Sequence, residues 1–203
     1  MKKEIRPFDF EIRAEQDEEH GRFLTGQPIV YGSRTDMGWY DEIIDDGALT
    51  DTDLRDVRFL VNHNTDMIPL ARSRNNNANS TMQMEVGEGQ GMTIRVNLDT
   101  ENNAEAKALY SAVERGDISG MSFMFRVDKD SWDDLESEHP TRHIRSIGRV
   151  FEVSAVTFPA YTSTHITARG LSEALESAKE SLESARSERR DVRKQKIRIL
   201  LEV

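Results

Sequence analysis

Short runs in which apolar and polar residues alternate recur along most of the chain, and they constrain its fold more than any other feature. In residues 6–15 (RPFDFEIRAE), Phe8, Phe10 and Ile12 fall on one face. A period of two is typical of a β-strand with one buried side. Seven or eight such strands, separated by turn residues, predict a mainly β (α+β) domain built as a barrel or sandwich. The other runs are residues 23–32, 41–49, 56–64, 80–98, 120–128 and 144–160.

Turn residues subdivide this pattern. Gly26 and Pro28 interrupt the second run, which predicts a kink or bulge there. A Gly-rich turn divides residues 80–98 into two alternating halves, which is typical of a hairpin. Residues 128–143 are polar and acidic, and we expect them to form a loop.

One segment inside the β-rich region has helical spacing. In residues 100–118, apolar side chains recur three and four positions apart. Thr100 is a candidate N-cap, and Gly116 follows the last apolar position, where glycine commonly ends a helix. The sequence therefore predicts a single helix before the strand that begins at Gly120.

The composition changes near the C-terminus. From Leu171 onwards Ser, Glu, Ala, Arg and Lys dominate, and a heptad seam runs to residue 199, interrupted by Arg189 and Lys196. We therefore divide the chain into a domain of residues 1–168 and a helical tail of residues 169–203. Three roles fit such a tail: packing on its own domain, docking to a partner helix, or a flexible tether.

Composition also limits the chemistry. The chain of 203 residues has no cysteine, which excludes disulfides, thiolate zinc sites and thiol nucleophiles. Its net charge of −10 argues against nucleic acid as a partner, because phosphate binding needs clustered Lys and Arg. No apolar run approaches the ~18 residues of a membrane span, and the N-terminus lacks the apolar core of a secretory signal. We expect a cytoplasmic protein that does not bind membranes.

Ser122 is a candidate nucleophile. It lies in Gly120-Met121-Ser122-Phe123-Met124, which matches the G-x-S-x-G of serine hydrolases except for the second glycine. More strand follows the serine, whereas a hydrolase elbow needs a strand-to-helix turn, so a general esterase is disfavoured. Alternation places Ser122 and Met124 on one face and Phe123 on the other. From the pattern alone, a small residue filling a tight packing site fits better than a nucleophile.

His63 is a candidate general base. It follows the apolar run Phe59-Leu60-Val61, so a strand leaving the core would place it at the rim of the domain. A neutral imidazole is the usual acceptor of a serine hydroxyl proton near neutral pH. An exposed loop histidine is the other interpretation of this position.

Three further residues are candidates for supporting roles. Glu152 lies within the apolar run Val150–Val156, where a carboxylate is costly to bury unless it is paired. It either faces solvent or orients a histidine N–H. His139 and His143 stand four residues apart, but Pro140 disfavours a helix between them, and two ligands alone are not a metal site. We expect no metal and no cofactor.

Taken in order, five motifs resemble the tailed-phage prohead proteases of the HK97 type, a family similar in fold to the herpesvirus assemblins. The resemblance covers residues 8 to 168, and its motifs occur in the expected order and spacing. These motifs are DEIIDDGAL, VRFLVNHNTDMIPLAR, the Gly-rich hairpin, ERGDISGMSFMF and FEVSAVTFPAYTST.

The resemblance implies a herpesvirus-protease-like β-barrel flanked by helices and a serine endopeptidase without metal or cofactor. It implies that His63 is the general base and Ser122 the nucleophile. The third catalytic member of assemblins is a histidine on the strand after the serine. The matching strand of this chain carries Glu152, and we expect Glu152 to orient His63, with His139 and His143 as fallbacks. The oxyanion donors have no matching motif, so a backbone N–H is expected to act there.

The resemblance also implies a setting. The enzyme would act inside the procapsid, in the host cytoplasm, on scaffold or on a scaffold-like N-terminal segment of the major capsid protein, and on itself. The tail would bind scaffold or be removed by autocleavage, and a homodimer is a further expectation. The alternative is a non-catalytic capsid assembly protein on the same fold, with the tail as its working part.

Overall fold

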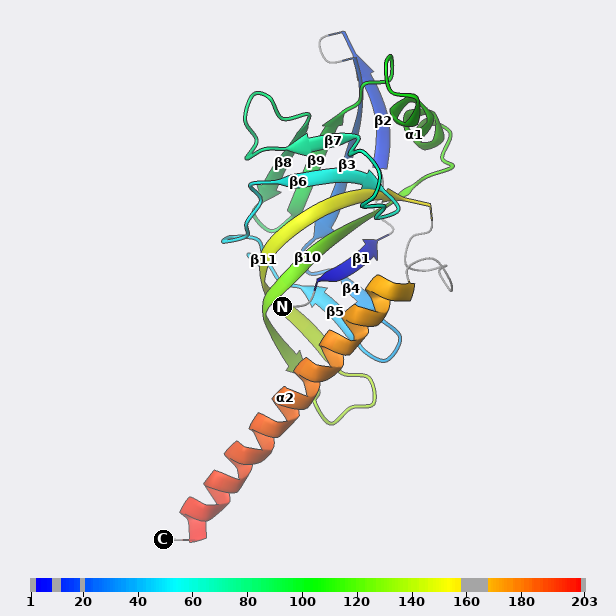
Figure 1. Cartoon of the computed structure of the whole chain (residues 1–203). Coiled ribbons are helices and arrows are strands. Elements are labelled where there is room, and N and C mark those ends of the chain that lie inside the picture. Colours follow the sequence, from blue (N-terminus) through cyan, green and yellow to red (C-terminus); the bar gives the residue numbers. More distant parts are fainter. Residues whose placement is uncertain (1–2, 9–11, 19–20, 158–167, 202–203) are drawn as a thin grey trace.

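Two β-sheets and two helices make up the part of the chain that this computed structural model describes, which is residues 3–8, 12–18, 21–157 and 168–201 (Figure 1). The prediction of a mainly β protein is thus confirmed. The strands are β1 Glu4–Phe8, β2 Ile12–Asp17, β3 Gly21–Val30, β4 Arg34–Asp36, β5 Asp41–Ile44, β6 Val57–Val61, β7 Ala71–Ser73, β8 Met82–Gly87, β9 Gly91–Asn97, β10 Gly120–Asp133 and β11 Thr141–Val156, and the helices are α1 Ala104–Glu114 and α2 Ala168–Leu201.

The larger sheet is organised around the long antiparallel hairpin of β10 and β11. Its order is β1-β10-β11-β5-β4, and β6 also pairs with β11, in parallel, with β7 alongside it. The smaller sheet has the order β2-β3-β9-β8. Neither sheet closes on itself within the described residues, so a closed barrel is not confirmed. Apolar side chains from both sheets and from α1 form one buried core.

Two local predictions are wrong. Residues 6–15 do not form one strand, because β1 pairs with β10 in the larger sheet while β2 pairs with β3 in the smaller one. Phe10 lies outside the described residues. Residues 128–143 are not one loop, because β10 continues to Asp133 and β11 begins at Thr141. The residues of this part of the two strands are mostly polar, so they lack the alternation of apolar and polar side chains that predicts a strand. Contacts with other segments of the folded chain stabilise them instead.

Other local predictions are confirmed. The pairing of β3 with β9 shifts register between Gly26 and Ile29, which is the expected bulge. The strands β8 and β9 form the predicted hairpin. The helix α1 forms as expected, but Asn103 rather than Thr100 caps it, because the Asn103 side chain accepts hydrogen bonds from two backbone N–H groups of the first turn. The left-handed Gly116 follows the helix, as predicted.

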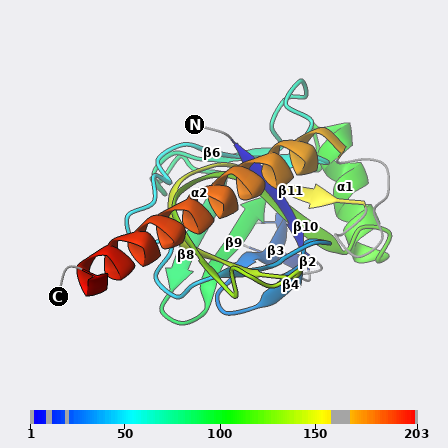
Figure 2. The ribbon, with the colours of Figure 1, turned by 90° about the horizontal axis from the view of Figure 1, so that it is seen from below.

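The first half of α2 lies along the larger sheet and contacts β1 and β10 (Figures 1 and 2). Ala178 and Leu182 are buried against Tyr40 and Trp132, with Leu175 packed beside them. These three positions belong to the heptad seam, so this half of the seam packs on its own domain. Neither helix of the described chain is long and apolar enough to span a membrane.

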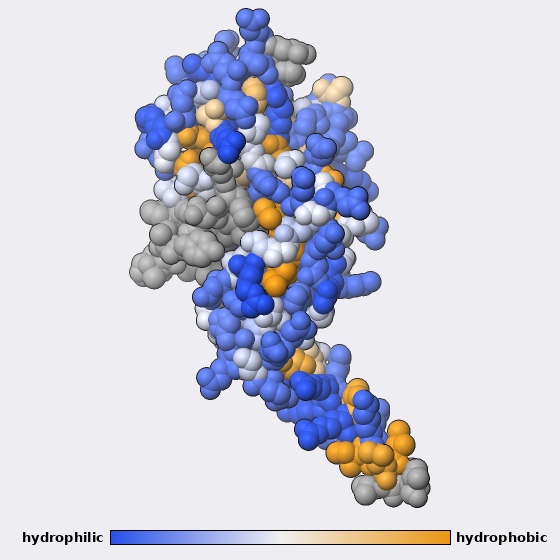
Figure 3. Space-filling model, turned by 180° about the vertical axis from the view of Figure 1, so that it is seen from behind, coloured by the Kyte–Doolittle hydropathy of each residue, from blue (hydrophilic) through white to orange (hydrophobic). Residues whose placement is uncertain are grey.

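The second half of α2 extends away from the sheets. Its apolar side chains gather near the C-terminal end of the helix, where they are solvent-exposed (Figure 3). The Arg and Lys residues around them make this end basic, although the chain as a whole is acidic. The exposed apolar residues are Val192, Ile197, Ile199 and Leu200.

A buried ionic cluster lies where α2 crosses the larger sheet. Glu4, Arg6, Glu42 and Arg142 come from three strands, and all four are nearly inaccessible to solvent. Arg6 pairs with both glutamates, and Arg142 Nη1 lies 2.9 Å from Glu4 and 3.2 Å from Glu42. Ser177 of α2 donates to Glu4 at 3.0 Å. Two cations thus face two buried anions, and Arg142 also pairs with the partly buried Asp130 at 2.7 Å. Such pairing is required because an unpaired buried charge is strongly destabilising.

The cluster makes stability depend on pH. Burial alone would raise the pKa of Glu4, but Arg6 and Arg142 outweigh burial and lower the pKa from 4.5 to about 2. In the unfolded chain Glu4 takes up a proton near pH 4.5, while in the folded protein it stays ionised to about pH 2. Its stabilising contribution is therefore complete above pH 4.5 and is lost as the pH falls towards 2.

Wild type should therefore lose unfolding free energy as the pH falls from about 5 to about 3. In Glu4→Gln, which has no carboxylate at this position, we expect this loss to be about 2 kcal/mol smaller. Urea unfolding at the two pH values measures this difference. Glu88→Gln, the same change at an exposed position, should behave as wild type does. If Glu4→Gln and wild type lose the same unfolding free energy between the two pH values, the assigned role of Glu4 is contradicted.

Candidate active site

Ser122 lies in β10, between β1 and β11. Its backbone is paired with Pro7 on one side and with Ser154 on the other. The neighbouring Met121 and Phe123 are fully buried in the main core. Alternation therefore directs Ser122 to the opposite face of the strand, as the sequence predicts.

His63 lies in a turn at the end of β6. Asn62 and His63 both have left-handed backbones, with φ of 51° and 56°. Asn and His are among the few non-glycine residues that adopt this region with some frequency, so the Asn-His pair suits the turn. Asn62 fixes the turn to the end of β11: its N–H donates to Ala155 O at 2.9 Å, and its side chain pairs with Thr157. Strained backbone of this kind often accompanies functional sites.

The structure brings together the three residues singled out in the sequence. His63 Nε2 lies 2.6 Å from Ser122 Oγ, and His63 Nδ1 lies 2.6 Å from Glu152 Oε1. Since β10 and β11 pair with Ser122 opposite Ser154, Glu152 lies two residues away from Ser154 on the same face. A carboxylate can only accept, so Nδ1 carries the hydrogen and Nε2 is left to accept from the serine hydroxyl. The arrangement can remove a proton from Ser122.

Ser154 completes the arrangement, and the sequence analysis missed it. The backbone N–H of His63 donates to Ser154 Oγ at 3.1 Å, and Ser154 Oγ in turn donates to Glu152 Oε2. The ring that results holds the carboxylate and the histidine backbone in one orientation. A period of two along β11 places Ser154 and Glu152 on one face, which is the signal that could have identified it.

All three candidate residues are shielded from solvent. Ser122 is fully buried, and only 7% of the His63 side chain and 4% of the Glu152 side chain are exposed. Low accessibility strengthens the electrostatic interactions within the group.

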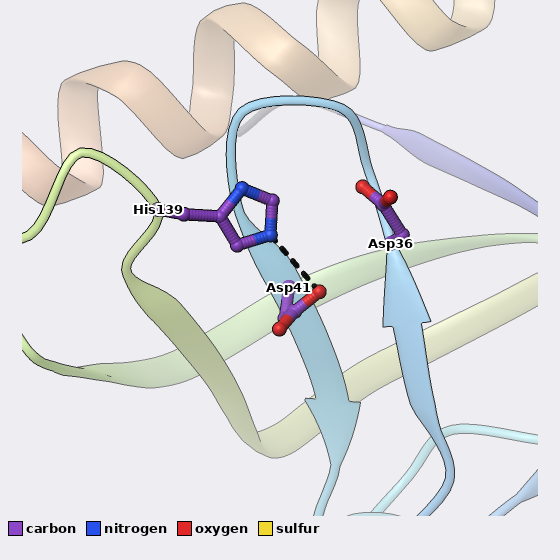
Figure 4. Close-up of side chains that lie close together, drawn as sticks. All are labelled: Asp36, Asp41 and His139. Atoms are coloured by element: carbon purple, nitrogen blue, oxygen red, sulfur yellow. Dashed lines mark hydrogen bonds and ion pairs between the residues drawn. The ribbon is translucent and has the colours of Figure 1, made fainter.

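The fallback histidines are engaged elsewhere. His139 Nε2 lies 3.1 Å from Asp41, and His143 Nδ1 lies 2.8 Å from Asp45. Figure 4 shows His139 directed at Asp41, with Asp36 on the neighbouring strand β4. The ligand atoms of these three residues lie within 4.8 Å of one another.

Ion pairing accounts for the approach of His139 and Arg34 to Asp41 without a metal. Asp41 already accepts hydrogen bonds from His139 and, at 2.7 Å, from Arg34. Burial would raise the pKa of Asp41, but these two hydrogen bonds more than offset it, so its pKa lies below the ordinary value. An ionised aspartate between two basic side chains is a stable arrangement on its own.

Comparison with known proteins places the chain in a family. Searches of curated proteins and of solved structures found no significant match. The model of one protein family, described as Caudovirus prohead serine protease, matches residues 8–180. The matched region spans Ser122, His63 and Glu152 and continues into α2. Since it covers most of the chain, the protein belongs to the caudovirus prohead serine protease family.

Proposed function

We propose that this protein is the serine endopeptidase of phage capsid maturation, with Ser122 as nucleophile, His63 as general base and Glu152 as the residue that orients His63. Family membership supports a capsid maturation protease. The observation that carries the residue assignment is the continuous chain of hydrogen bonds from Ser122 through His63 to Glu152. Nucleophile, base and orienting group are in the order that acyl transfer requires.

The chemistry follows from this chain of contacts. As Ser122 Oγ bonds to the carbonyl carbon of the substrate, its proton passes to His63 Nε2, and Glu152 stabilises the imidazolium. When the C–N bond breaks, His63 returns that proton to the leaving amine. Water then attacks the acyl ester, gives a proton to His63, and releases the acid as Ser122 regains its hydrogen.

We propose that the substrates are the scaffold or the scaffold-like N-terminal segment of the major capsid protein, together with the chain itself, inside the procapsid. Residues 1–168 would carry the catalysis. The exposed outer half of α2, within the tail of residues 169–203, is suited to bind helical scaffold, because its apolar residues have no cover in the described chain. Docking would raise the local concentration of protease at its substrate.

The substrate assignment is tested by co-expressing the wild-type chain with its phage's capsid and scaffold proteins. New N-termini mapped by mass spectrometry should appear on one or both of these proteins and on the protease. A capsid protein and a scaffold that keep their full masses in assembling particles would overturn this proposal.

Glu152→Gln should slow cleavage about 10⁴-fold, because the amide NH2 can donate to Nδ1 and so favours the tautomer with its hydrogen on Nε2, which cannot accept the serine proton. Glutamine has nearly the same shape as glutamate, so the melting temperature should stay close to that of wild type. Initial rates of precursor cleavage measure the effect. Glu85→Gln, at an exposed position in β8, is the matched control. A Glu152→Gln variant as fast as the control would exclude the orienting role.

A further inference from the structure

An apolar cavity of about 450 Å³ lies beside the candidate active site. Its walls come from the end of β6 and the turn that follows, from α1, and from the segment that leads into β10. We propose that this cavity is a substrate subsite that receives a large apolar side chain close to the scissile bond. This inference rests on the proposed function. The charged Glu105 of α1 also lines the cavity, and the apolar lining residues are Val61, Met67, Ala108, Leu109, Ala112 and Ile118.

The position of the cavity links it to the chemistry. Asn62 and Asn64, on either side of His63, both line it. Ile118, which also lines the cavity, precedes Ser122 by four residues along the chain. The turn that carries the proposed base and the segment that leads into the strand of the proposed nucleophile therefore both contribute to the cavity wall. An extended peptide advances at most about 3.5 Å per residue, so a side chain in this cavity belongs to a residue near the cleaved bond.

The lining determines what the cavity accepts. Met67 and Ile118 are only partly buried and pack against the main core, which leaves apolar surface towards the cavity. Ala108 and Ala112 are one turn apart on α1, and their small side chains leave room for a large guest. Burying a Leu-, Met- or Phe-sized side chain there favours binding, and discrimination against a small one is on the order of 10- to 200-fold.

A larger cavity, on the four-stranded sheet, is not an alternative. It has a volume of about 770 Å³ and is lined by charged, polar and apolar residues of β2, β3, β8 and β9. Neither Ser122, His63 nor Glu152, nor any residue next to them in the chain, lines it. The smaller cavity is the one that shares its walls with the site.

Cleavage of a proteome-derived peptide library by the full chain tests this inference. We expect wild type to show enrichment of Leu, Met or Phe at one fixed position near the cleaved bond. Ala112→Leu, which fills the cavity without touching the candidate catalytic residues, should lower cleavage at those sites 10- to 100-fold and shift the enrichment towards Ala, Ser and Gly. Lys107→Leu adds the same side chain to α1 outside the cavity and should match wild type.

The outcomes separate this inference from the proposed function. Wild-type cleavage without an apolar preference at any position, or an unchanged preference in Ala112→Leu, would overturn the subsite while leaving the protease intact. A library left uncut by wild type would overturn the proposed function, and the subsite with it. If Ala112→Leu lowers the melting temperature, Ala108→Leu, at an exposed position of the same wall, gives the same test.

Discussion

Replacing Ser122 by alanine is expected to reduce cleavage of the capsid precursor about 10⁶-fold, to a level undetectable on a gel. The only atom removed is the Oγ that lies 2.6 Å from His63 Nε2. Without it no acyl-enzyme can form, and the residual rate comes from binding and electrostatics alone. Alanine fits the buried position of a serine, so the fold should persist.

The matched control is Ser146→Ala, the same change in β11 away from the site. Intact masses of the precursor, sampled over time with each variant, measure the effect. We expect processing at the wild-type rate with Ser146→Ala. Equal processing by Ser122→Ala and Ser146→Ala would mean that Ser122 is a packing residue.

Replacing His63 is expected to cost a similar factor of about 10⁶, because without the imidazole no group accepts the Ser122 proton. The choice of substitution matters here, since His63 has a φ of 56°. Asparagine tolerates this left-handed backbone better than alanine does. His63→Asn therefore removes the imidazole and preserves the turn, and its far-UV circular dichroism should equal that of wild type.

His139→Asn provides the control for His63→Asn. It removes a histidine that is paired with Asp41 at a distance from the site, and we expect it to retain full activity. Precursor cleavage rates and thermal melting measure both variants. If His63→Asn unfolds, or if it cleaves as fast as His139→Asn, the histidine is structural and the assignment of the base fails.

The candidate site could be anticipated to a large extent because its signals are local. Alternation around Ser122 indicates which face of β10 the hydroxyl occupies, and this face is set by the backbone alone. His63 could be placed at the end of a strand from the apolar run before it. The apolar run around Glu152 made it a candidate to orient a histidine, and the resemblance to a known family favoured it as the third member.

The features that escaped prediction depend on long-range pairing. The sequence predicted one strand for residues 6–15 where two strands join different sheets, because alternation does not reveal which partner a strand meets. Ser154 went unnoticed because its role exists only once β6 lies parallel to β11. The outer part of the β10–β11 hairpin looked like a loop because the partners of its polar side chains, such as Ser181 of α2 for Asp130, are distant in the chain.

The assignment of Ser122 as the nucleophile is tested most directly by covalent labelling with a fluorophosphonate, in a sample that is actively processing the capsid precursor. We predict that processing stops as one label is incorporated, that peptide mapping places the label on Ser122, and that His63→Asn abolishes the labelling. The assignment would be contradicted if activity were lost as another residue became labelled, or if the protease were inhibited while Ser122 stayed unmodified.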